Sequence, residues 1–294
     1  MESQEFIGLP LCSRKKNSGM ARAVGVLREA GIADSLRTRT SAFVDYGDVA
    51  FPEIHTDSGR DTLVNFSYFL RASERIRSAF GEVNARGLMF CLGGECSICV
   101  GTLAGLESRV KGRPGIVWID AHGDFNTPET TASGYIGGMC LAMACGRGPE
   151  LKGIVHGGKS LISEENVVHL ASRALDPSEA KAIASSSMRV YSASAIRDKG
   201  IRPTVDSLVS SLANRCDWIM CHLDVDAIDP RIMPAVNFPE PDGLTFDEAK
   251  AVVGAVQETG KLKLFELAGY NSDLDENRTC AVKLVTFVSD MMVH

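Results

Sequence analysis

Short apolar runs alternate with amphipathic stretches along the whole chain. The apolar runs have the length and continuous hydrophobicity of strands buried on both faces of a parallel sheet. The amphipathic stretches repeat their apolar residues at the helical period. This alternation predicts βαβ units and a single α/β domain over residues 1–294, with a mostly parallel sheet and helices on both faces. The predicted strands are Leu88–Leu92, Gly115–Ile119, Met188–Ser192, Trp218–Leu223 and Leu262–Leu267, and the predicted helices are Ala21–Glu29, Asp61–Phe80, Ser97–Leu106, Pro177–Ser185, Val205–Ala213, Phe246–Glu258 and Cys280–Met292.

Composition narrows the class of partner and the compartment. The chain is 45% hydrophobic, carries a formal net charge of -6 and lacks a basic patch, which excludes nucleic acid and anionic membrane surfaces as expected partners. Its apolar runs are shorter than the ~20 residues that span a bilayer, and the acidic N-terminus does not resemble a signal peptide. The nine cysteines are scattered, often within apolar runs, as in reduced proteins. We therefore predict a cytoplasmic protein.

Three short segments carry the candidate chemistry, and each follows a predicted strand. They are Gly93–Ser97, Asp120–Asp124 and His222–Asp226. Because parallel strands end at the same edge of a sheet, the three segments are expected to converge on one point. Carboxylates crowded at that point repel one another unless a cation lies between them. The irregular stretches 126–138 and 229–243 follow two of these segments and are expected to be active-site loops. A third irregular stretch, 43–58, is also predicted to be a loop.

The donor atoms of two of these segments suit a pair of divalent ions. Asp120, His122 and Asp124 alternate, as do Asp224 and Asp226, so each set points to one side of its strand. Mixed oxygen and imidazole ligands favour manganese or a similar ion, whereas structural zinc prefers Cys and His. Two ions roughly 3.5–4 Å apart can share a hydroxide. The alternative is that each Asp-x-Asp only caps a following helix.

His222 alternates in phase with Asp224. This position is consistent with a group that lies beside the metal ions and orients a ligand. It is equally consistent with a core histidine whose hydrogen bonds are all satisfied.

These motifs resemble those of the ureohydrolases, the family of arginase, agmatinase and formiminoglutamase. The family patterns Gly-Gly-Asp-His-Ser, Asp-Ala-His-x-Asp and Asp-x-Asp-x-x-Asp-Pro match this chain in order, the first with changes. The resemblance covers nearly the whole chain and implies a three-layer α/β/α sandwich with a central parallel sheet, two Mn²⁺ ions per chain and a homotrimer or homohexamer. The matching segments are Asp45–Asp48, Gly93–Ser97, Asp120–Asp124, Asp224–Pro230 and Phe238–Thr245.

The resemblance also implies a role for each motif residue. Asp120 and Asp224 bridge both ions, and a shared hydroxide attacks the electrophilic carbon of an amidine. Asp124 helps to stabilise the tetrahedral intermediate and gives a proton to the departing nitrogen. The implied ligands are Cys96, Asp120, Asp124 and Asp224 for one ion and His122, Asp120, Asp224 and Asp226 for the other.

Cys96 stands where the family usually has its first metal-binding histidine. A thiolate there binds an ion, weakens the preference for manganese or, as a buried apolar group, takes no part. The stretch 123–139 resembles a subgroup that shares this cysteine, the hydroxyarginine-hydrolysing enzyme of cycloserine biosynthesis. We therefore predict that Cys96 is a metal ligand.

Of the other positions that concern the substrate, two match the family and three depart from it. Asn126 and Ser133 match residues that bind the α-carboxylate of the substrate in arginases. Gly137 replaces the usual shuttle histidine, and Gly269 replaces the strand-end glutamate that grips the guanidinium. Arg197 stands near the lost site for the α-amino group, where it either binds a carboxylate or is solvated. A small modified amidine or formimino compound of the amino-acid type is therefore expected, rather than arginine.

Two other functions are compatible with the sequence. The first is a non-catalytic ureohydrolase relative that binds a small molecule or serves as an oligomer partner, which the departures favour. The intact carboxylates disfavour it, because burying charge without function is costly. The second is a nucleotide-binding protein, because residues 153–160 fit the P-loop pattern. A turn-like stretch precedes these residues instead of a buried strand, so we predict a dinuclear-metal hydrolase.

Overall fold

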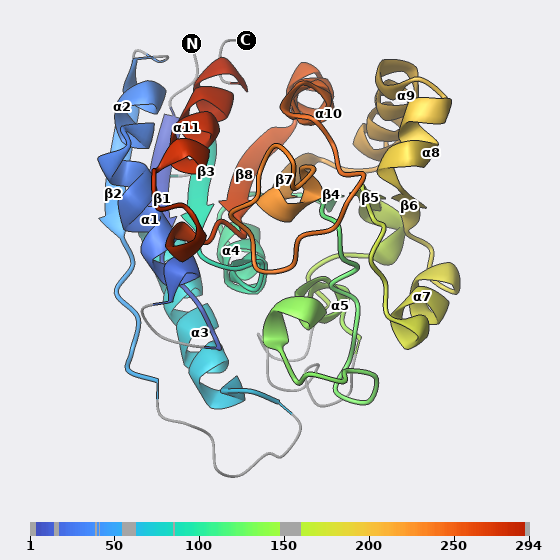
Figure 1. The fold of residues 1–294 in the computed structure, drawn as a ribbon, viewed down its shortest axis with the longest axis horizontal. Coiled ribbons are helices and arrows are strands. Elements are labelled where there is room, and N and C mark those ends of the chain that lie inside the picture. The colour runs from blue at the N-terminus through green and yellow to red at the C-terminus, as the bar shows by residue number, and fades with distance from the viewer. Residues whose placement is uncertain are drawn as a thin grey trace.

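The fold was analysed in a computed structural model that describes residues 4–14, 18–38, 40, 42–54, 63–84, 86–147 and 160–291. Its centre is one eight-stranded sheet in which every paired strand is parallel, in the order β2-β1-β3-β8-β7-β4-β5-β6 (Figure 1). The strands are β1 (Gln4–Leu9), β2 (Phe43–Asp48), β3 (Leu88–Gly93), β4 (Pro114–Ile119), β5 (Val167–Leu170), β6 (Arg189–Tyr191), β7 (Trp218–Asp224) and β8 (Leu262–Ala268).

Helices cover both faces of this sheet, so the predicted α/β/α sandwich is confirmed. One face packs against α1 (Gly19–Glu29), α2 (Ile32–Arg37), α8 (Ala193–Asp198), α9 (Ile201–Ala213), α10 (Phe246–Glu258) and α11 (Thr279–Met291). The other face packs against α3 (Phe66–Glu82), α4 (Ile98–Glu107), α5 (Cys140–Ala144) and α7 (Pro177–Ala184).

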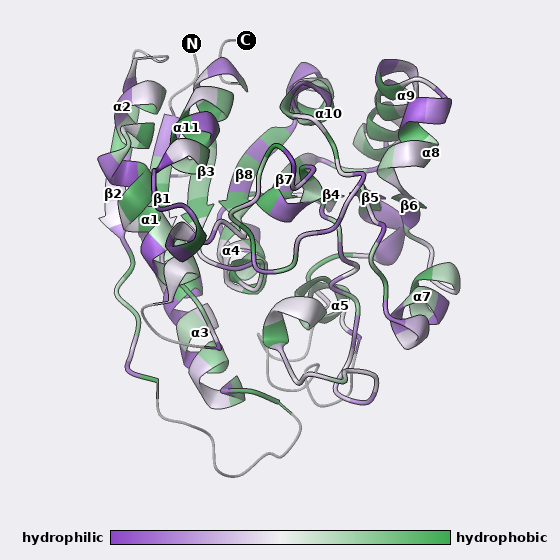
Figure 2. Ribbon diagram, viewed as in Figure 1, coloured by the Kyte–Doolittle hydropathy of each residue, from purple (hydrophilic) through white to green (hydrophobic). Residues whose placement is uncertain are grey.

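Side chains of the central strands alternate between the two apolar layers. On β3, Phe90 and Leu92 join the layer of α1 and α11, whereas Met89 and Cys91 join that of α3 and α4. Burial on both faces explains why such strands are continuously hydrophobic. Figure 2 shows the complementary pattern on the helices, where hydrophobic and hydrophilic residues alternate around the turns of α9 and α11.

All five predicted strands are present, with ends that differ by at most one residue. Three further strands, β1, β2 and β5, were not predicted, and the expectation of a loop at the start of the 43–58 stretch is wrong because β2 occupies its first six residues. Helix α9 begins at Ile201 instead of Val205, since Pro203 lies in its first turn, where proline is tolerated.

Helix α3 begins at Phe66, after Asn65 in the left-handed conformation, and not at Asp61, which lies outside the described residues. In the described part of the chain, no helix combines the length and apolar character that a membrane crossing requires.

Candidate metal centre

The three motif segments meet at one edge of the sheet. Strands β3, β7 and β4 all run in the same direction, and β8 lies between β3 and β7. Their carboxyl ends therefore open onto the same crevice, which is where parallel sheets bind ligands. Cys96 follows β3, the Asp120–Asp124 segment follows β4, and Asp224 and Asp226 stand at the end of β7.

This crevice contains a pocket of about 500 Å³. Its lining includes the side chains predicted to bind metal ions, from segments up to 130 residues apart in sequence, together with two predicted substrate residues. The predicted residues that line it are Cys96, Asp120, His122, Asp124, Asn126, Ser133, Asp224 and Asp226.

On one side of the pocket, a thiol faces two carboxylates. The Cys96 thiol donates to Asp224 Oδ2 at 2.7 Å, and its sulfur lies 4.0 Å from Asp120 Oδ2. Trp118 Nε1 also donates to Asp120 Oδ2, at 3.1 Å. All of these side chains are buried. The arrangement brings one sulfur atom and the oxygen atoms of two carboxylates together, which are three of the four side chains predicted to bind the first ion.

On the other side, His122 stands between two carboxylates. Its Nδ1 lies 2.9 Å from Asp226 Oδ2 and 3.7 Å from Asp120 Oδ1. The backbone N–H of Ala121 donates to Asp226 Oδ1 at 3.2 Å. The ligand atoms of Asp120, His122 and Asp226 lie within 4.8 Å of one another, so one ion can contact all three side chains. Asp120 faces both sides, as expected of a bridging ligand.

Backbone geometry holds the motif side chains in place. The N–H of His122 donates to Asp120 Oδ1 at 2.7 Å, and the N–H of Asp226 donates to Asp224 Oδ1 at 2.8 Å. Asp124 adopts a left-handed conformation with φ of 48°, which costs free energy in a residue other than glycine. The Cys140 thiol donates to Asp124 Oδ2 at 3.3 Å. Strain of this kind is typical of functional sites.

The protonation of these groups indicates that a cation belongs among them. Burial raises the pKa of Asp124 and of Asp224 well above the usual value, and the neighbouring charge of Asp120 adds to both shifts. Burial and Asp120 also raise the pKa of Asp226 to about 6. Burial lowers the pKa of His122, but hydrogen bonds to Asp120 and Asp226 outweigh it and raise the value to about 12. Divalent ions would relieve this repulsion, so the donor set fits a metal pair.

Metal binding is therefore expected to release protons and to weaken as the pH falls. A ligand must be deprotonated to bind, and at pH 7 the raised pKa of His122 keeps its imidazole protonated. At least one proton should be released per chain at pH 7, and affinity should fall further below pH 6 as Asp226 takes up a proton. Calorimetric titration with Mn²⁺ in two buffers of different ionisation enthalpy measures this release. Equal binding enthalpies in both buffers would contradict the prediction.

The predicted substrate residues have different surroundings. Asn126 donates to Asp176 Oδ2 at 3.0 Å, and exposed Ser133 accepts from the Tyr135 N–H at 3.2 Å. Arg197 is not part of the pocket lining. Its guanidinium is paired with the Glu248 carboxylate through two contacts of 2.7 Å, which disfavours a role in substrate binding. All three roles stay predictions.

Tyr135, which the sequence analysis missed, packs against Gly137, the residue at the position of the shuttle histidine. A Cβ atom added to Gly137 would lie 2.5–2.7 Å from the ring and hydroxyl of Tyr135, so a larger residue there would force Tyr135 to move. The Tyr135 hydroxyl donates to Glu95 Oε2 at 3.0 Å. Phe238, 45% exposed, contacts both His122 and Tyr135 at the pocket lining. The sequence offered one signal for this contact, namely that the aromatic residue Tyr135 lies only two positions before Gly137.

Gly269, at the end of β8, cannot be replaced without disturbing the site. Its φ of 86° is favourable only for glycine. A Cβ atom there would lie 2.1 Å from Asp224 Oδ1. The close approach of this backbone to a predicted metal ligand leaves no room for a glutamate side chain unless Asp224 moves.

The P-loop-like segment lies almost entirely outside the described residues, which resume at Ser160. The nucleotide-binding alternative therefore gains no support from the structure.

Comparison with known proteins agrees with the motif assignment. Residues 3–293 match the family model described as the arginase family. An arginase of Bacillus caldovelox is 31% identical over 286 residues, which cover 96% of this chain and 95% of that protein. The crystal structure of an arginase from Bacillus subtilis has a TM-score of 0.88 at 28% identity and covers 99% of both chains. A formimidoylglutamase from Bacillus subtilis shares the fold, with a TM-score of 0.79 at 19% identity over 99% of this chain and 86% of that one.

Proposed function

Because the chain belongs to the arginase family of ureohydrolase-type hydrolases, which act on guanidino-type substrates, we propose that it hydrolyses a C–N bond in a linear amidine of the amino-acid type. Two divalent ions bound by the protein would take part in this reaction. The observation that supports this most directly is the single pocket that collects five carboxylate, thiol or imidazole groups around Asp120. Seven acidic side chains line the pocket in all, which favours cations.

When bound, a pair of divalent ions lowers the pKa of a shared water toward neutrality and so supplies the nucleophile. The residues of this chain supply the rest. Asp120 and Asp224 would hold both ions, Cys96 and Asp124 would join one, and His122 and Asp226 would hold the other. Manganese as the metal, two ions per chain, a trimeric or hexameric assembly and a cytoplasmic location belong to this proposal.

Asp124 is proposed to deliver the proton to the departing nitrogen. Burial and the charge of Asp120 raise the pKa of its carboxyl, a property that a general acid needs at neutral pH. Asp124→Asn should therefore lower kcat by about 10²–10⁴-fold. Steady-state kinetics measure this loss, with elemental analysis of the same samples. Asp229→Asn is the control, since Asp229 is buried nearby but paired with Arg231, and an unchanged kcat in Asp124→Asn would contradict the assignment.

The substrate is proposed to be a hydroxylated guanidine or a formimino compound that keeps its α-carboxylate. Gly269 offers no carboxylate to a guanidinium, and Gly137, against which Tyr135 packs, stands in place of the shuttle histidine. A hydroxyguanidine is a weaker base than a guanidine and depends less on such a carboxylate. The likeness to the hydroxyarginine-hydrolysing subgroup supports the same choice.

A substrate panel tests this proposal. Arginine, hydroxyarginine, agmatine, guanidinobutyrate and formiminoglutamate are each incubated with the manganese-loaded protein, and urea, hydroxyurea and formamide are measured. We expect kcat/KM to be at least about tenfold higher for hydroxyarginine than for arginine, the size of effect of one lost or gained polar contact. Agmatine lacks the α-carboxylate and should be the poorer substrate. An arginine kcat/KM equal to that of hydroxyarginine would contradict the proposed specificity.

A further inference from the structure

A buried histidine beside the site has an unused nitrogen. His222, on β7, is fully buried, and its Nδ1 lies 2.8 Å from Glu266 Oε2 on the adjacent strand. Its other ring nitrogen, Nε2, has no hydrogen-bond partner among the described residues. The interpretation of His222 as a satisfied core histidine is therefore wrong.

The groups that hold His222 are themselves buried in an apolar layer. Thr102 of α4 donates to Glu266 Oε1, and Glu266 is fully buried. The surrounding side chains belong to the apolar layer between the sheet and α4, which includes Cys91 and Trp118. A polar chain in such a place is costly unless each of its groups is paired. In this chain of Thr102, Glu266 and His222, the imidazole Nε2 is the group left without a partner among the described residues.

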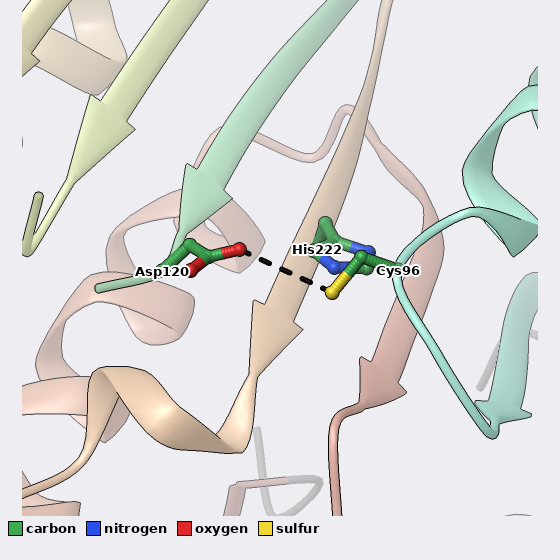
Figure 3. Close-up of side chains that lie close together, drawn as sticks. All are labelled: Cys96, Asp120 and His222. Carbon is green, nitrogen blue, oxygen red and sulfur yellow. Dashed lines mark hydrogen bonds between the residues drawn. The ribbon is translucent and has the colours of Figure 1, made fainter. Parts of the chain in front are cut away.

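That imidazole lies next to two predicted metal ligands. Donor atoms of Cys96, Asp120 and His222 all lie within 4.8 Å of one another. Figure 3 shows the three side chains turned toward one another, Asp120 and His222 on neighbouring strands and Cys96 on the loop beside them. The His222 ring stacks on Trp118, with ring centroids 3.8 Å apart and planes inclined by 10°. Stacking and the Glu266 contact together fix the orientation of the ring.

The Glu266 contact also determines which nitrogen can bind a metal. A carboxylate only accepts hydrogen bonds, so Nδ1 carries the proton and Nε2 presents its lone pair. Metal-binding histidines nearly always donate their other ring N–H to a carboxylate or carbonyl in this way. His222 and Glu266 thus have the arrangement of a metal ligand and the group that orients it.

We propose that His222 Nε2 binds, together with Cys96 Sγ and Asp120, the ion on the Cys96 side of the pocket, and that this position selects zinc over manganese. Thiolate and imidazole donors suit zinc, whereas oxygen-rich sets suit manganese. The position formed by His122, Asp120 and Asp226 has no sulfur and keeps the manganese preference. The presence of two ions is taken from the proposed function, on which this inference rests. The inference changes the identity of the ion on the Cys96 side from manganese to zinc.

Metal competition and cobalt spectroscopy test this inference on the full chain. The protein is stripped of metal under reducing conditions, offered Zn²⁺ and Mn²⁺ together, desalted and analysed for both elements. About one equivalent of zinc per chain should be retained. In a parallel sample loaded with Co²⁺, a thiolate-to-cobalt charge-transfer band should appear in the near ultraviolet, with strong visible bands from a site of low coordination number.

Two ligand variants and one control separate the contributions of Cys96 and His222. Cys96→Ala should lose the charge-transfer band, whereas Cys221→Ala, which removes a buried thiol on the opposite face of the sheet, should keep it. His222→Asn retains an amide that can donate to Glu266 but removes Nε2. It should keep the charge-transfer band, shift the visible bands and weaken zinc binding by more than the roughly 10–100-fold typical of losing an orienting group alone. Circular dichroism confirms that each variant is folded.

The outcomes also distinguish this inference from the proposed function. Identical cobalt spectra and zinc affinities for the wild type and folded His222→Asn would overturn the inference. Retention of manganese at both positions, with hydrolysis of an amidine, would overturn it while supporting the proposed function. Zinc held through Cys96 and His222 in a protein inactive on the whole panel would leave the inference standing and refute the proposed function.

Discussion

Gly269→Ala is expected to lower kcat/KM by at least about 100-fold and to impair metal binding. The added Cβ would lie 2.1 Å from Asp224 Oδ1, so Asp224 or the backbone must move by more than 1 Å to reach ordinary contact distance. Displacement of a reacting group by about 1 Å can cost about 100-fold in rate. The left-handed φ of 86° adds roughly 1–2 kcal/mol of backbone strain for alanine. Kinetics and elemental analysis of the purified variant measure both effects.

Gly260→Ala is the matched control. Gly260 also has a left-handed φ, 66°, at the end of α10, but a Cβ atom there meets nothing within 4 Å. It should lose about 1 kcal/mol of stability and keep its metal and activity. Equal activity in the two variants would show that Gly269 does not constrain Asp224. By the same argument, Gly269→Glu should not create an arginase, because the glutamate cannot enter without displacing Asp224.

Most of the predicted strands are buried on both faces, although the interior strand β1 was missed and the half-buried edge strand β6 was predicted. Strands β3, β4, β7 and β8 are continuous apolar runs, and the sequence pattern predicted each of them. Strand β2 was missed because it is an edge strand with no fully buried residue, so its composition matches that of a loop. Strand β5 has only four residues, one of which is His169, so its sequence lacks a continuous apolar run.

The composition of the pocket could be predicted because its ligands lie within short motifs. The geometry around them depends on pairings that sequence spacing does not specify. His222 and Glu266 are register partners on adjacent strands 44 residues apart, and their contact follows only from the strand order. Arg197 was a candidate for binding a substrate carboxylate, and its guanidinium is instead paired with Glu248, 51 residues later in the capping box of α10. A loop position alone could not have indicated that partner.

The second large effect is expected from Asp224→Asn, which should abolish retention of the metal pair and lower kcat by roughly 10²–10³-fold or more. Asp224 is proposed to bridge both ions, and an amide cannot replace a bridging carboxylate. The wild type should gain about 2.7 kcal/mol of stability at a metal concentration of 100 Kd, and the variant should gain little. Thermal unfolding with and without Mn²⁺, together with kinetics, measures these differences. Full metal retention would refute the bridging role.

In the metal-free protein, the same substitution should have the opposite effect on stability. Burial and the charges of Asp226 and Asp120 raise the pKa of Asp224, so its ionised form destabilises the fold as the pH rises through that value. Asparagine removes this cost, and the metal-free variant should unfold at or above the temperature of the metal-free wild type near pH 8. Asp275→Asn is the contrasting control, because Asp275 lies away from the pocket. Its carboxylate accepts hydrogen bonds from the Cys280 N–H, the Ala281 N–H and the Tyr270 hydroxyl. These bonds outweigh the effect of burial and lower the pKa of Asp275. This substitution should destabilise the protein with or without metal and leave metal content unchanged. If the metal-free Asp224→Asn protein is less stable than the metal-free wild type, the Asp224 carboxylate stabilises the fold even without a bound cation, which would contradict this prediction.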